Sequence, residues 1–89
     1  EFNGKNQKNT AECAVMVAYE FRKNEEFEIL GPVPEYISKI KDEYRYRLIV
    51  HSADDLMLMN RAREIYDKLR DEFENLGVYM KPKTEGIRI

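Results

Sequence analysis

The chain has 89 residues, enough for one small domain whose folding buries about 60% of the unfolded surface. With 43% hydrophobic and 36% charged residues it is globular, and a net charge of −2 excludes a strongly basic protein that coats nucleic acid. No apolar run approaches the ~20 residues of a membrane span, so we expect a cytoplasmic protein. Because the chain starts at Glu1 rather than methionine, we also expect a domain of a longer protein.

The first half of the chain predicts a helix and then a strand. Thr10 is expected to cap a helix from about Ala11 to Lys23, although its run CAVMVAYEF is also compatible with a buried strand. The alternation of residues 27–29 predicts a strand, which the Gly31-Pro32 pair is expected to end because proline cannot donate to a ladder.

A second strand is predicted from Tyr44 to His51, where side chains alternate cleanly between two faces. One face holds Tyr44, Tyr46, Leu48 and Val50, and the other holds Arg45, Arg47, Ile49 and His51. A third, short strand is predicted at residues 78–80, and residues 83–89 are expected to add a further edge strand.

Between these strands lies a long predicted helix, capped by Ser52 and ended by Gly77 in a left-handed conformation. Its apolar stripe is predicted at Met59, Ala62, Tyr66, Leu69, Phe73 and Leu76. The order of elements indicates an α+β fold, a small antiparallel sheet with two helices on one face. This is a ferredoxin-like βαββαβ unit with a short or truncated first strand. We expect residues 1–10 to be a remnant or the end of that strand, and residues 11–89 to be one domain.

Residues that carry chemistry are scattered. Cys13 is the single cysteine, which excludes an internal disulfide, and its apolar surroundings predict a buried structural thiol. One cysteine and one histidine cannot supply the four ligands of a structural zinc site. Glu64–Lys68 and Arg63–Asp67 are expected to be surface pairs of the long helix. We therefore expect this chain itself to hold no catalytic residue, no metal and no cofactor.

Positive charge gathers in one window. Residues 39–51 carry a net charge of +2, whereas residues 1–38 and 52–89 carry −3 and −1. The basic residues of this window are Lys39, Lys41, Arg45 and Arg47. Lysine and arginine bind phosphates, and interleaved tyrosines stack on unpaired bases. Arg45 and Arg47 are expected side by side on one strand face, roughly 7 Å apart. The alternative is that both arginines simply face solvent while the tyrosines enter the core.

A family resemblance lies in the stretch GPVPEYISKIKDEYRYRLIV, which follows FEIL. It resembles the C-terminal domain of primosomal protein N′, the bacterial replication-restart DNA helicase PriA, over about Ala11 to Pro82. The residues that carry the resemblance are Gly31, Pro32, Pro34, Ile37, Lys39, Ile40, Lys41, Tyr44, Arg45, Tyr46, Leu48, Ile49 and Val50. Before the Tyr-Arg repeat the family usually has a glycine and a basic residue, where this chain has Asp42 and Glu43.

The resemblance implies an accessory domain of a larger, ATP-dependent 3′–5′ DNA helicase that rebuilds the primosome at abandoned forks. ATP, Mg²⁺ and Zn²⁺ would belong to other parts of that parent protein. The implied partners are forked or single-stranded DNA, the helicase core of the same chain, single-stranded-DNA-binding protein and primosome proteins, with no membrane. The expected DNA-binding residues are Lys39, Lys41, Arg45, Arg47 and Tyr46, and Gly31, Pro32 and Pro34 are expected to fix a rigid connection.

Two other interpretations stay open. The domain is alternatively a protein-interaction module that docks on the helicase core or on a primosome or single-stranded-DNA-binding partner and contacts DNA little. A third possibility is a free-standing RNA-binding or ribosomal-type domain. Salt dependence separates the first two, because neutralising four phosphates gives a slope of about −3.6 in log affinity against log salt, whereas apolar docking is nearly independent of salt.

Overall fold

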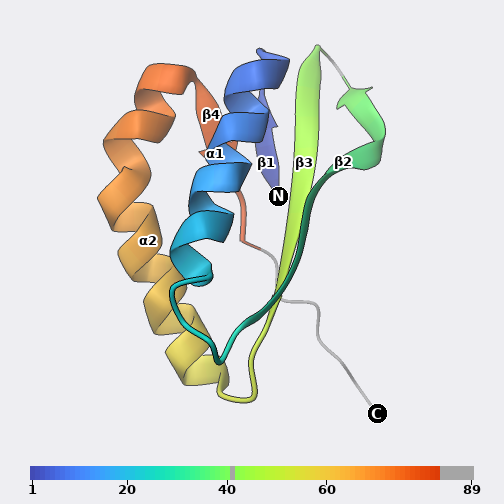
Figure 1. The fold of residues 1–89 in the computed structure, drawn as a ribbon. Coiled ribbons are helices and arrows are strands. Elements are labelled where there is room, and N and C mark those ends of the chain that lie inside the picture. The colour runs from blue at the N-terminus through green and yellow to red at the C-terminus, as the bar shows by residue number, and fades with distance from the viewer. Residues whose placement is uncertain (41, 83–89) are drawn as a thin grey trace.

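A computed structural model of the chain describes residues 1–40 and 42–82 (Figure 1). Its elements are β1 Phe2–Gly4, α1 Gln7–Phe21, β2 Glu28–Ile40, β3 Glu43–His51, α2 Asp55–Leu76 and β4 Val78–Met80. The strands form one antiparallel sheet in the order β2-β3-β1-β4, and both helices lie against one of its faces (Figure 1). The predicted α+β fold of βαββαβ order is therefore confirmed, with a first strand of three residues. The edge strand expected at residues 83–89 lies outside the described residues.

The hydrophobic core fills the space between the helices and the sheet. Its buried members are Phe2, Cys13, Ala14, Val17, Phe21, Phe27, Ile65, Leu69, Phe73 and Val78. Phe2 and Phe73 meet edge to face at 6.3 Å between ring centroids, which joins β1 to α2. Across the described residues, no helix is both long and apolar enough to cross a membrane.

The start of α1 differs from the prediction. Asn6, and not Thr10, is the N-cap, since Asn6 Oδ1 accepts a hydrogen bond from Asn9 N at 2.9 Å. Thr10 is fully buried, and its hydroxyl donates to the Asn6 carbonyl at 2.7 Å. The helix therefore begins at Gln7. The prediction placed its start too late because the first turn is polar and precedes the apolar periodicity on which the prediction was based. The run CAVMVAYEF is helical, as expected.

The core-facing stripe of α2 also differs from the prediction. Met59 is 63% exposed and Tyr66 is 38% exposed, whereas Ile65 is fully buried. The residues of α2 that belong to the core or pack against it are Met57, Leu58, Ala62, Ile65, Leu69, Phe73 and Leu76. A 22-residue helix with many apolar residues offers two neighbouring stripes of three- and four-residue spacing, and only tertiary packing selects between them.

Both ends of α2 are capped. Asp54 is the N-cap in place of the predicted Ser52, because Asp54 Oδ1 accepts from Met57 N at 3.0 Å. Ser52 instead contacts the backbone of Asp54, whose N–H donates to the Ser52 hydroxyl at 3.1 Å. Gly77 ends the helix with φ 68 and ψ 38, as predicted, and lets the chain turn directly into β4.

β2 does not end at Gly31-Pro32 but continues past this pair, whose peptide bond is cis. Its pairing with β3 runs from Glu28 opposite His51 to Ile40 opposite Glu43, with register shifts on either side of residues 33–34. β2 is an edge strand, and edges and bulges are the places where sheets accommodate proline. The prolines therefore make the ladder irregular without ending the strand.

Candidate nucleic-acid interface

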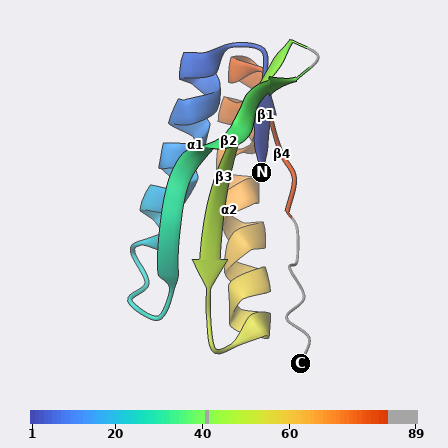
Figure 2. The ribbon, with the colours of Figure 1, turned by 90° about the vertical axis from the view of Figure 1, so that its right-hand side faces the viewer.

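β3 divides its side chains between the two faces of the sheet. Tyr46, Leu48 and Val50 pack against the core beneath the helices. Alternation along the strand then places Arg45 and Arg47 on the opposite face. Within the described ranges both helices lie on the core side, and Figure 2 views the sheet with the helices behind it. We call the side that carries Arg45 and Arg47 the open face.

A cross-strand row crosses the open face. Asn3 on β1 lies directly opposite Arg45 on β3 and, on its other side, directly opposite Tyr79 on β4. Directly opposite residues in antiparallel strands share a face, so these three side chains are neighbours. Tyr79 is 65% exposed, and its ring is therefore available for stacking. We call these residues the Arg45–Asn3–Tyr79 row.

The two arginines differ in availability. Arg47 is exposed and lies opposite Val33 of β2. The Arg45 side chain is 27% exposed, and its Nη1 atom is 3.8 Å from a carboxylate oxygen of Glu1. Lys81, also exposed, continues the β1–β4 pairing, since Lys81 N donates to the Glu1 carbonyl at 2.7 Å. The open face thus carries three cations together with acidic residues, namely Glu1 beside Arg45, Glu43 two residues before Arg45 on β3, and Glu28 opposite His51.

The remaining sequence-predicted residues are placed differently. Tyr46 lies on the core side, and its hydroxyl accepts from Gln7 Nε2 at 3.4 Å, so it is not on the face of the arginines. Lys39 belongs to β2 opposite Tyr44, but its side chain is outside the described part of the structure, and Lys41 is outside the described residues. The structure therefore brings Arg45 and Arg47 together on the open face and separates Tyr46 from them.

Three open-face residues were missed by sequence reasoning, namely Asn3, Tyr79 and Lys81. Residues 1–10 were treated as peripheral because a three-residue strand carries almost no periodic signal. Tyr79 stands between the core-facing Val78 and Met80, and this alternation was the available signal. Its placement beside Asn3 depends on strand pairing, which the local pattern does not give.

Gly31 positions the backbone next to Arg47. Its φ of 100 lies in a region that residues with a Cβ rarely adopt, and an added Cβ would lie 2.8 Å from the Arg47 carbonyl oxygen. The Arg22 guanidinium donates to the Gly31 carbonyl at 3.1 Å, which ties this point to α1. Pro32 and Pro34 follow within the irregular part of β2. Glycine is thus the residue that allows β2 to approach β3 closely here.

On the helical side, the charged side chains meet at Glu20 rather than in the predicted pairs. Lys68 Nζ donates to Glu20 Oε2 at 2.9 Å, in place of the expected contact with Glu64. Arg61 contacts both Glu20, at 3.5 Å, and Glu64, at 3.3 Å. The hydrogen bond from Lys68 holds the pKa of buried Glu20 below its ordinary value, against the opposing effect of burial, with a further contribution from Lys23. This cluster joins α1 to α2.

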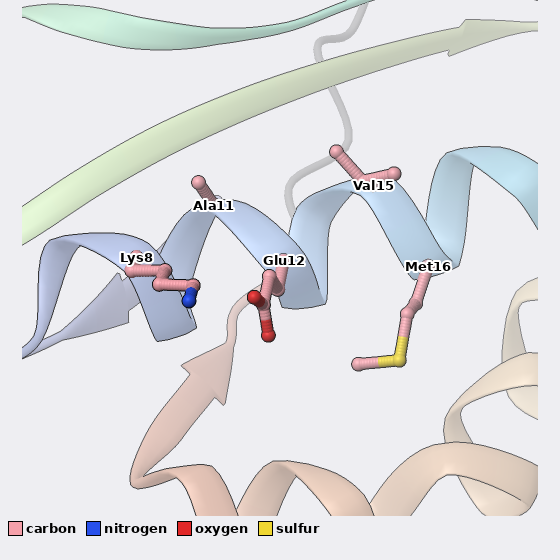
Figure 3. A pocket seen from close by; sticks show the side chains of 5 residues that line it. All are labelled: Lys8, Ala11, Glu12, Val15 and Met16. Carbon is pink, nitrogen blue, oxygen red and sulfur yellow. The ribbon is translucent and has the colours of Figure 1, made fainter.

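A shallow depression on α1 is lined by Lys8, Ala11, Glu12, Val15 and Met16. Figure 3 shows Glu12 and Met16 extending from one side of the helix and Val15 from the other. These side chains point in different directions, and their only charged groups are the Glu12 carboxylate and the Lys8 amine, which do not point toward a common position. The depression therefore has no arrangement suited to catalysis or to ligand orientation.

Residues 1–78 match the family described as the primosomal protein N C-terminal domain. The match includes β1, the Gly31-Pro32 segment and all of β3, and so covers the strand that carries Arg45 and Arg47. Searches of curated proteins and of solved structures gave no match. Since the match spans most of its length, the chain belongs to the family of primosomal protein N C-terminal domains.

Proposed function

We propose that the chain is an accessory domain of a replication-restart helicase and that its open face binds forked or single-stranded DNA. Family membership supports the primosomal part of this proposal. The observation that carries the DNA-binding part is the presence of Arg45, Arg47 and exposed Tyr79 together on a sheet face away from the helices. The ATP-driven motor, with its Mg²⁺ and Zn²⁺ sites, would then belong to other domains of a cytoplasmic parent protein.

The spacing of the arginines supports a single strand as the ligand. Arg45 and Arg47 are two residues apart on β3, which separates their Cα atoms by about 7 Å. Guanidinium groups at this interval can follow successive phosphates of an extended strand. A four-stranded sheet with an exposed aromatic side chain also gives unpaired bases a surface on which to stack. The bases of duplex DNA already stack on one another and do not need such a surface.

The direct test is fluorescence anisotropy with labelled single-stranded, forked and duplex DNA, titrated from low to physiological salt. Replacing exposed Arg47 by Gln removes one phosphate contact and should make the slope of log affinity against log salt less negative by about 0.7. Arg63, an exposed arginine of α2 in the helical layer, provides the matched control. Arg63→Gln should leave the slope unchanged.

A folded sample that binds none of the DNAs at low salt would refute the DNA-binding proposal. Equal effects of Arg47→Gln and Arg63→Gln would also contradict it, because they would indicate a nonspecific response to net charge. Circular dichroism of each variant confirms that the comparison is between folded proteins.

The second candidate function is protein docking, and exposed apolar residues favour it. Leu30 and Val33 are exposed on β2 and lie opposite Ile49 and Arg47, on the open face. The partner would be the helicase core, single-stranded-DNA-binding protein or a primosome protein. Binding through these side chains would be nearly independent of salt and would weaken on Leu30→Ser. DNA binding would instead follow Arg47.

A further inference from the structure

The centre of the Arg45–Asn3–Tyr79 row contains polar atoms that lack hydrogen bonds. Asn3 is only 1% exposed, yet neither its Oδ1 nor its Nδ2 atom has a partner among the described residues. Arg45 Nε, in the directly opposite residue, is also buried and without a partner there. Buried polar groups are nearly always hydrogen-bonded, so three such atoms in one cross-strand pair require an explanation.

These atoms define the chemistry of a ligand. Asn3 Oδ1 needs a donor, whereas Asn3 Nδ2 and Arg45 Nε need acceptors. Phosphate and carboxylate groups supply acceptors alone and would leave Oδ1 unsatisfied. The edge of a nucleobase presents a donor and acceptors side by side, and asparagine amides pair with such edges.

The aromatic side chain of the row supplies the second element of base recognition. Tyr79 lies directly opposite Asn3 on the other side from Arg45, and its ring is exposed. A base whose edge reaches Asn3 therefore has an aromatic surface next to it. Stacking on such a surface strengthens binding by roughly 5- to 160-fold per base.

We infer that the Arg45–Asn3–Tyr79 row is a subsite for one unpaired nucleobase, an inference that rests on the proposed binding of DNA by the open face. Arg45 opens the subsite when it exchanges Glu1 for a backbone phosphate. Its present contact with Glu1, at 3.8 Å, is longer than a hydrogen bond, so a phosphate oxygen that accepts a direct hydrogen bond from the guanidinium would compete with it. The base then stacks on Tyr79 and pairs with the Asn3 amide. Paired bases in a duplex cannot do this, so the subsite favours single-stranded DNA.

The test compares two oligonucleotides of equal length and charge, one bearing bases and one abasic, with the 89-residue chain and its variants. The wild-type chain should bind the base-bearing strand at least about fivefold more tightly. Tyr79→Ala should abolish this preference while leaving the affinity for the abasic strand unchanged. Tyr19→Ala is the matched control, because Tyr19 is 63% exposed but lies on α1.

The outcomes separate this inference from the proposed function. If the wild-type chain binds both strands equally, or if Tyr79→Ala keeps the preference, the base subsite is refuted while DNA binding by the open face stands. If it binds neither strand, both proposals fail. Asn3→Leu provides a second arm and should reduce the preference for the base-bearing strand without weakening binding of the abasic strand.

A spectroscopic measurement gives an independent readout. The chain contains no tryptophan, so Tyr79→Trp places a single tryptophan in the row. Its fluorescence should be quenched by the base-bearing strand and not by the abasic strand, because quenching requires stacking with a base. Tyr19→Trp should respond to neither. Equal quenching by both strands would overturn the assignment of Tyr79 as the stacking residue.

Discussion

Asn3 and Arg45 lie directly opposite each other on β1 and β3, and they hold three buried side-chain atoms without a hydrogen-bond partner in the part of the chain that the structure describes. An unsatisfied buried polar group costs about 1–3 kcal/mol. For a small domain this is a considerable fraction of a total stability of about 5–15 kcal/mol. A nucleobase bound in the proposed subsite would offset this cost by supplying the missing hydrogen bonds.

Replacing Asn3 by Leu tests this cost. Leucine has nearly the same size and removes two unsatisfied atoms, so the free energy of unfolding in urea should rise by about 1–2 kcal/mol. Thr10→Val is the matched control, since Thr10 is equally buried but its hydroxyl is hydrogen-bonded to Asn6. That variant should lose about 1 kcal/mol. Equal losses of unfolding free energy in the two variants would show that the Asn3 side-chain amide has hydrogen-bond partners in solution.

The two glycines with positive φ should respond differently to alanine. At Gly77 an added Cβ meets nothing within 4 Å, so Gly77→Ala should cost only the left-handed conformation, about 1 kcal/mol. At Gly31 the Cβ would also meet the Arg47 carbonyl oxygen at 2.8 Å. Gly31→Ala should therefore cost about 2 kcal/mol or more. Urea denaturation of the two variants measures the free energy of unfolding that each loses. A smaller loss for Gly31→Ala than for Gly77→Ala would contradict this prediction.

The Glu20 cluster predicts a specific dependence of stability on pH. The folded state lowers the pKa of Glu20 from 4.5, mainly through the hydrogen bond from Lys68. As the pH falls, Glu20 is therefore protonated in the unfolded state before it is protonated in the folded state. The stability that its ionised form contributes is fully present above pH 4.5 and is lost as the pH falls from 4.5 through the lower pKa of the folded state.

Glu20→Gln removes this titration. The variant should be less stable than the wild type near neutral pH by about 1–2 kcal/mol, and the difference should shrink as the pH is lowered through the acidic range. Urea denaturation at a series of pH values measures it, with exposed Glu26→Gln as the control. A difference that does not change with pH would mean that Glu20 is not ion-paired.

Cys13 should be chemically inert in the folded protein. Burial raises the pKa of its thiol to about 11, with smaller contributions from Glu12 and Glu72, and the thiolate is the reactive form. Labelling with a thiol-reactive disulfide reagent at neutral pH should be at least about 100-fold slower in the native state than in urea. Comparable rates would show that α1 opens readily.

Much of this fold was predictable because its elements have strong local signals. The alternation of β3 identified the arginine face and the core face correctly, and Gly77 marked the end of α2. The turn between β2 and β3 shows that another residue can take the place of the glycine that the family usually has there. Asp42, where the family usually has glycine, adopts φ 64, and aspartate is one of the few other residues that tolerate this region.

The remaining features depend on tertiary packing. The choice of Ile65 over Tyr66 for the core is made by contact with the sheet and α1, and not by spacing along α2. The Arg45–Asn3–Tyr79 row joins three strands that are far apart in sequence, so no local pattern predicts it. Lys68 likewise pairs with Glu20 on another helix instead of with its own helical neighbour.

The most direct test of the account is to record amide chemical shifts of the ¹⁵N-labelled chain as single-stranded DNA is added. We predict that the largest changes fall on open-face residues, at Asn3, Arg45, Arg47 and Tyr79, and that the outer surface of α2 is unaffected. Changes confined to α2 around Met59 and Arg63, with none at the row, would contradict the assignment of the open face as the DNA-binding surface.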